Sequence, residues 1–309
     1  MAASPRRLLT WLLAPSVEEG SRSHAFAAVG LRLVAGLLWL YNVSWKHAPD
    51  FGQYDGTALY GFTQAAVDHP VFPPYSWLVE QLILPNFLPF AWGVLVVETL
   101  LGVLLLSGAF VRIAAALGVA QSLAIGLSVA LTPGEWPWAY AMMIAIHVVL
   151  LFSASGRFLS VDAVRAGKQD GRVLAWMWGV IGVVAGVVEV ARSAADPIAA
   201  SGPSSGAGDF EIGIGNYNLL GGLVLVVLGG LLVLWARTRS SQAAFAAAAV
   251  AALAGLSLHA QLGFSDPVLG GSPTSASVFF TLAVVAAGLG FASRESHFSE
   301  RVPARVVRS

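Results

Sequence analysis

Five ionisable residues lie within long apolar segments of this chain, namely Arg32, Glu98, His147, Glu189 and His259. A charged side chain in the middle of a membrane helix costs roughly 2.5–3.5 kcal/mol on insertion scales, so each of the five is a candidate functional residue. A guanidinium can bind an anion, while a carboxylate and an imidazole can exchange protons. Their positions in the membrane therefore decide which chemistry they could share.

The first three of these residues are expected at one depth in the membrane. With a helical rise of about 1.5 Å per residue, Arg32 lies roughly 10 Å, Glu98 roughly 13 Å and His147 roughly 9 Å from the cytoplasmic end of its segment. The sequence therefore predicts an Arg32–Glu98 ion pair with His147 within reach. Such a pair either holds two helices in register or lines a polar pocket that suits a quinone head group or a proton relay.

The other two residues, Glu189 and His259, belong to the opposite layer of the membrane. Each lies near the external end of its segment, and Asp266 follows shortly after the second. We expect both side chains to be satisfied by contact with external water. The alternative is a second site that handles protons or a ligand.

Several kinds of cofactor site are not expected in this chain. It contains no cysteine, which excludes disulfides, thiolate catalysis and cysteine-held iron–sulfur clusters. A membrane haem needs two axial ligands at matching depth, whereas His147 and His259 lie near opposite faces. No histidine–carboxylate cluster has the spacing of a zinc site. We therefore predict neither haem nor metal.

The composition identifies the kind of protein that must position these residues. The 309 residues are 57% hydrophobic and only 11% charged, with a mean hydropathy of +0.74 and a formal net charge of zero. Balanced charge without a basic cluster argues against binding of nucleic acid. Continuous apolar runs in lipid must be helical, so the chain is predicted to be an all-α, polytopic, multi-pass protein of the cell membrane. About eight spans are expected, at residues 25–45, 86–106, 113–131, 136–152, 173–190, 217–235, 243–262 and 277–292.

The distribution of lysine and arginine predicts the orientation of these spans. Fourteen of the 17 basic residues fall in connections on one side, one (Arg32) lies inside a span, and only Lys46 and Arg192 are on the other side. Positive charge marks the cytoplasmic side, so both termini are predicted to be cytoplasmic. The short apolar run 8–14 lacks the features of a cleavable signal and is expected to form a helix at the membrane interface.

The connections divide the chain into two four-helix halves. Residues 1–24 form a cytoplasmic segment, 25–165 the first half with a long external loop at 46–85, 173–293 the second half, and 294–309 a cytoplasmic tail. The aromatic residues of the long loop predict that it packs on the membrane surface or caps the bundle. The Ser- and Gly-rich connection 193–215 is expected to be a flexible loop. The glycine pairs at 221–222 and 229–230 predict close helix packing.

Short motifs in the first half, over residues 25–165, match the pattern of one family in their order and spacing. They are Leu31-Arg32-Leu33, Trp45-Lys46, Pro49-Asp50-Phe51, Pro85-Asn86, Glu98-Thr99-Leu100-Leu101-Gly102, Leu106-Ser107-Gly108 with Arg112, Glu135-Trp136-Pro137-Trp138-Ala139-Tyr140, and Gly156-Arg157-Phe158-Leu159-Ser160-Val161-Asp162. With these motifs, the half resembles the DoxX-like membrane family, in particular its DoxD type.

The resemblance implies a function that the residues alone do not establish. The DoxD type is described as a subunit of thiosulfate:quinone oxidoreductase, which implies a quinone as electron acceptor and a partner redox subunit, with membrane lipid around the chain. We place the candidate catalytic residues Arg32, Glu98 and His147 around a quinone or an anion. Arg112 and Arg157 would bind the substrate or an anion near the cytoplasmic mouth. The alternative is a membrane scaffold without catalytic activity that recruits a redox partner.

Overall fold

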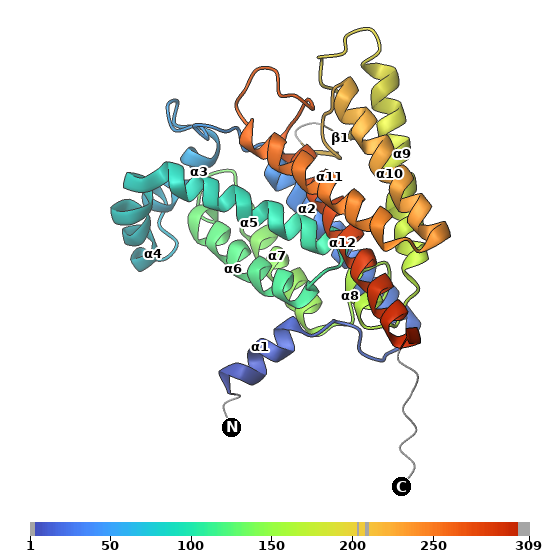
Figure 1. Cartoon of the computed structure of the whole chain (residues 1–309). Coiled ribbons are helices and arrows are strands. Elements are labelled where there is room, and N and C mark those ends of the chain that lie inside the picture. The colour runs from blue at the N-terminus through green and yellow to red at the C-terminus, as the bar shows by residue number, and fades with distance from the viewer. Residues whose placement is uncertain (1–3, 203, 208–209, 302–309) are drawn as a thin grey trace.

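The computed structural model describes residues 4–202, 204–207 and 210–301, which form a bundle of helices with one small hairpin (Figure 1). The elements in chain order are α1 (Pro5–Leu13), α2 (Arg22–Ser44), α3 (Ala58–Asp68), α4 (Pro73–Leu78), the π-helical turn η1 (Val79–Ile83), the 3₁₀ turn η2 (Leu84–Asn86), α5 (Phe87–Ser107), α6 (Val111–Val129), α7 (Pro137–Phe152), α8 (Val161–Arg165), α9 (Gly171–Arg192), β1 (Ser204–Ala207), β2 (Phe210–Gly213), α10 (Leu219–Thr238), α11 (Ser241–Ala260) and α12 (Pro273–Arg301).

The long helices confirm an all-α protein that crosses a membrane several times. Seven helical segments in the described part of the chain are long and apolar enough to span a bilayer. The remaining predicted span, at 136–152, corresponds to α7, which has 16 residues and is shorter than the usual length. Helix α1 and the C-terminal end of α12 lie at the same end of the molecule (Figure 1). The count of eight spans and the cytoplasmic placement of that end stay predictions.

Most long helices pack against a neighbour in sequence. Helix α2 lies along α5, α6 along α7, α9 along α10 and α11 along α12. The two predicted halves also meet, because α5 of the first half packs against α12 of the second. A functional site can therefore form between the halves as well as within one of them.

The long connection at 46–85 is more structured than a loop, since it contains α3, α4 and the turns η1 and η2. Phe51 is fully buried and its ring packs edge-on against Trp92 of α5, with ring centroids 5.3 Å apart. Tyr54, in contrast, is 89% exposed. The connection at 193–215, predicted to be flexible, contains the antiparallel pair β1 and β2.

Glycines allow α9 and α10 to approach each other closely. A Cβ atom added at Gly229 would lie 2.5 Å from the carbonyl oxygen of Gly179, and one added at Gly186 would lie 2.5 Å from the carbonyl oxygen of Gly222. Close packing is therefore confirmed for Gly222 and Gly229. Gly230 differs, because a Cβ atom there would meet nothing within 4 Å.

This difference gives a matched pair of substitutions. We expect Gly229→Ala to lower the free energy of unfolding by about 1–3 kcal/mol, because the new methyl group would press on the backbone of α9. Gly230→Ala has the same chemistry without the contact, and alanine favours helix over glycine by up to roughly 1 kcal/mol. Denaturation in mixed detergent micelles measures both variants. Equal stability of the two would contradict the close contact.

Candidate functional site

Arg32 lies where α2 passes the connection between α7 and α8. Its side chain is fully buried, and Nη2 donates to the carbonyl oxygen of Leu159 at 2.8 Å. Nη1 lies over Gly108 at the turn after α5, where an added Cβ atom would be only 1.8 Å away. Nε and Nη1 have no hydrogen-bond partner within the described residues. Arg32 therefore fastens the connection between α7 and α8 to α2.

Glu98 belongs to a different group of residues, in the middle of α5. Its carboxylate forms an ion pair with Lys46 and accepts a hydrogen bond from Nε2 of Gln121 at 3.1 Å. Nζ of Lys46 also donates to the carbonyl oxygen of Asn42 at 2.7 Å and lies 3.9 Å from the ring centroid of Trp45. Both charged side chains are at most 2% exposed. The predicted Arg32–Glu98 ion pair is wrong, because Lys46 takes the place of the arginine.

Burial affects the protonation of this lysine, which is the second residue after the end of α2. Removal from water lowers the pKa of Lys46, and the nearby carboxylate of Glu98 opposes that shift. The ammonium group has three N–H donors and three partners in reach: Asn42, Glu98 and the face of Trp45. Lys46 binds the end of α2 and Glu98 of α5, and Glu98 also accepts a hydrogen bond from Gln121 of α6. The ion pair therefore links α2, α5 and α6.

The register of α2 against α5 explains why Arg32 and Glu98 do not meet. Gly36 packs on Leu106 and Gly102 packs on Leu40, so the two helices run antiparallel. This register places Glu98 beside residue 44, twelve residues or roughly 18 Å along α2 from Arg32. Helix α2 extends more than three turns beyond the end of α5, so depths counted from the end of each segment did not share a common origin.

His147 forms a third group with α2 and α6. Its Nε2 accepts a hydrogen bond from Nε1 of Trp39 at 2.9 Å, and its Nδ1 donates to the carbonyl oxygen of Met143 at 2.7 Å. The ring lies directly on Gly118, where an added Cβ atom would be 1.9 Å from Cδ2. Nε2 therefore links α7 to α2, whereas Nδ1 is taken up by a carbonyl of α7 itself. The predicted common pocket of Arg32, Glu98 and His147 is therefore wrong.

The two arginines predicted at the cytoplasmic mouth both hold the N-terminal segment. Arg112 forms an ion pair with Glu18 and donates to the carbonyl oxygen of Trp11 at 3.2 Å. Nη1 of Arg157 donates to the carbonyl oxygen of Gly20 at 2.7 Å. These contacts are made to the chain itself, so anion binding by Arg112 and Arg157 stays a prediction.

Glu189 does not contact external water as expected. It is fully buried, with Oε2 accepting a hydrogen bond from Oγ of Ser201 at 2.8 Å and Oε1 lying 3.8 Å from Nη1 of Arg192. Ser201 comes from the connection that was predicted to be flexible. Glu189 therefore anchors that connection to the end of α9.

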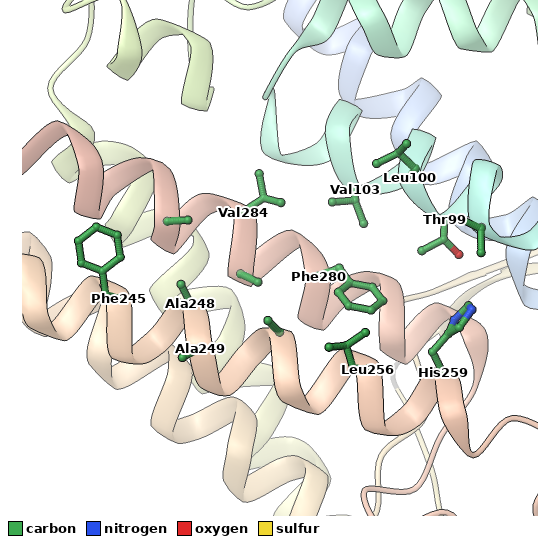
Figure 2. A pocket seen from close by; sticks show the side chains of 14 residues that line it. Thr99, Leu100, Val103, Phe245, Ala248, Ala249, Leu256, His259, Phe280 and Val284 are labelled. Carbon is green, nitrogen blue, oxygen red and sulfur yellow. The ribbon is translucent and has the colours of Figure 1, made fainter.

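A cleft that could hold a ligand lies between α5, α11 and α12. This cleft has a volume of about 800 Å³, and nearly all of its lining is apolar. Its walls are formed by residues such as Leu100 and Val103 of α5, Ala248 and Leu256 of α11, and Phe280 and Val284 of α12 (Figure 2). A cleft of this size and character fits a lipophilic small molecule.

Two polar side chains, Thr99 and His259, lie together at one end of this cleft (Figure 2). Thr99 is only 7% exposed, and its Oγ1 has no hydrogen-bond partner in the described part of the chain. Nδ1 of His259 also has no hydrogen-bond partner among the described residues. The ring of His259 packs edge-on against Trp92, with ring centroids 5.7 Å apart. Unpartnered buried polar atoms are costly, and a polar group of a ligand at this end of the cleft would satisfy them.

A family model described as "TQO small subunit DoxD" matches residues 27–187, slightly more than half of the chain. The chain belongs to the DoxD family. No curated protein and no solved structure gives a match. The matched region of this DoxD protein includes α2, α5, α6 and α7, and so includes Lys46, Glu98 and Thr99. Helices α11 and α12, which form two walls of the cleft, lie outside it.

The roles of two residues of this DoxD protein, Lys46 and Thr99, are not predicted from the sequence. Lys46 was assigned to the external side by its position after a span, although a long aliphatic stem lets a lysine reach back along its helix. Thr99 stands beside Glu98 as a hydroxyl within a strongly apolar run, and this was a usable signal. His259 is recognisable from the sequence as ionisable, and its alternative role at a ligand site stays a prediction.

Proposed function

We propose that this DoxD protein is the quinone-binding membrane subunit of an oxidoreductase, and that the cleft between α5, α11 and α12 takes the quinone. The observation that carries the proposal is the pair of unpartnered polar atoms, on Thr99 and His259, at one end of an otherwise apolar cleft. The family description calls DoxD a small subunit, and a small subunit implies a partner subunit as well.

The chemistry of this end of the cleft suits a quinone. A quinone ring carries carbonyl oxygens that accept hydrogen bonds, and its isoprenoid chain is apolar. The hydroxyl of Thr99 can donate one hydrogen bond, and the imidazole of His259 can donate another from Nδ1. The ring of Trp92 packs edge-on against the imidazole, which restricts the orientation of the His259 donor before the ligand arrives.

Reduction of a bound quinone needs an electron donor. Cysteine-held iron–sulfur clusters are excluded by composition, and no group of three or more His, Asp or Glu side chains that could hold a metal is found among the described residues. A reduced-sulfur anion such as thiosulfate, acting directly or through the partner subunit, is the donor that the resemblance implies. The protein's own part is to bind and orient the acceptor.

Mass spectrometry of the intact protein, purified in detergent, tests this proposal. We expect quinone to be bound to the wild type. Added quinone should bind Thr99→Val and His259→Ala about two- to tenfold more weakly, because each variant loses one hydrogen bond. Thr281→Val is the matched control, since that buried hydroxyl donates to the carbonyl oxygen of Ser277 and does not line the cleft.

The alternative function is a membrane scaffold that recruits a redox partner. It would be favoured by a soluble protein that co-purifies in stoichiometric amount while the membrane protein neither retains nor binds quinone. Absence of quinone binding by the wild type would contradict our proposal directly. Quinone binding that neither Thr99→Val nor His259→Ala weakens would place the quinone elsewhere.

A further inference from the structure

The cleft is long and has different chemistry at its two ends. Its lining on α11 extends from Phe245 to His259, which corresponds to roughly 21 Å along the helix. Thr99 and His259 lie at one end and Phe245 at the other (Figure 2). A ligand that matches this cleft has one polar end and a long apolar remainder.

Small side chains keep the middle of the cleft open. Ala248, Ala249 and Ala252 of α11 and Ala283 and Ala287 of α12 line this part of it. Ala249 is exposed, so this part of the cleft opens towards the surface that lipid would cover. An apolar channel with lateral access suits a flexible hydrocarbon chain that enters from the bilayer.

The polar end belongs to the external half of the membrane on the predicted orientation. His259 is the penultimate residue of α11, and this helix begins after the connection that carries Arg237 and Arg239. Basic connections mark the cytoplasmic side. The ring of a ligand held by His259 would therefore lie near the external surface.

The residues that line the cleft favour a quinone over a phospholipid as its ligand. No lysine or arginine is among the residues that line the described cleft. The phosphate of a phospholipid needs a cation or several donors, whereas a neutral quinone ring needs only the hydrogen bonds that Thr99 and His259 can supply. The absence of positive charge therefore favours a neutral head group.

We propose that the alanine-lined channel binds the isoprenoid chain of a long-chain quinone, with the ring at the external end between Thr99 and His259. This inference rests on the proposed function, and it adds that the protein recognises the chain as well as the ring. It also gives the second half of the protein a role, since α11 and α12 lie outside the matched family region.

Binding of two quinones that share one ring tests the inference, one with a long isoprenoid chain and one without. Purified protein in nanodiscs is titrated with each quinone, and the dissociation constants are compared. We expect the long-chain quinone to bind the wild type at least tenfold more tightly. Ala252→Phe should block the channel. It should lower the affinity for the long-chain quinone at least tenfold and change the affinity for the chainless quinone less than twofold.

Val250→Phe is the matched control, because Val250 is on the same helix, exposed to lipid and outside the cleft. It should change neither affinity. Ala249→Leu obstructs the channel less and replaces Ala252→Phe if that variant does not fold. It should lower the affinity for the long-chain quinone only. Equal affinity of both quinones for the wild type would overturn the inference. So would loss of both quinones in folded Ala252→Phe, since the ring would then occupy the middle of the channel.

A quinone with an azide on its ring tests the position of the ring separately. Light-induced labelling should fall on peptides that contain Trp92, Thr99 or His259. Labelling around Phe245 would overturn the proposed direction of the ligand, although the protein would still bind quinone. If the wild type binds neither quinone, the proposed function itself fails, and this result is distinct from the failure of chain recognition.

Discussion

Removing either charge of the Lys46–Glu98 pair is expected to cost about 3–5 kcal/mol of unfolding free energy, and removing both is expected to cost much less. Both side chains are at most 2% exposed, so a single substitution leaves the other charge buried without its counter-ion. Lys46→Met would leave the carboxylate of Glu98 with only the hydrogen bond from Gln121. Glu98→Gln would leave the ammonium of Lys46 unpaired.

A double-mutant cycle with Lys46→Met and Glu98→Gln measures this coupling by denaturation in mixed detergent micelles. The control is Arg239→Gln, which breaks the ion pair of Arg239 with Asp170. Those two side chains are 35% and 51% exposed, and exposed pairs contribute about 1 kcal/mol or less. Additive effects of Lys46→Met and Glu98→Gln would show that the pair is not coupled and would contradict its role as a clamp.

The spans were predictable from the sequence because lipid permits so few alternatives. An apolar run that crosses the bilayer must satisfy its backbone internally, so hydropathy alone predicts a helix. The span predicted at 113–131 is the helix Val111–Val129, and the span predicted at 243–262 is the helix Ser241–Ala260. The boundaries shifted by two residues, which is the usual uncertainty of helix ends.

The site was much less predictable, because it depends on the register in which the helices pack. The contacts of Gly36 with Leu106 and of Gly102 with Leu40 set the register of α2 and α5, and neither contact can be read from one sequence. The same register places Lys46 rather than Arg32 beside Glu98. The cleft depended on contacts still further apart, since Thr99 and His259 are 160 residues apart in the chain.

Gly118→Ala is expected to destabilise the protein by about 2–5 kcal/mol. Its new Cβ atom would lie 1.9 Å from Cδ2 of His147, so the imidazole must move. Movement would break the hydrogen bond that Nε1 of Trp39 donates to His147 and leave a buried donor without a partner. The cost therefore combines overpacking with the loss of a buried hydrogen bond.

A control and a second substitution show whether this collision is the cause. Gly93→Ala changes a glycine of α5 at which an added Cβ atom meets nothing within 4 Å, so it should leave the stability nearly unchanged. Adding His147→Ala to Gly118→Ala removes the ring that collides, so the double variant should be no less stable than His147→Ala alone. If Gly118→Ala unfolds at the same detergent fraction as Gly93→Ala, then the imidazole does not occupy the space over Gly118. The hydrogen bond between Trp39 and His147 would then not be what holds α2 to α7.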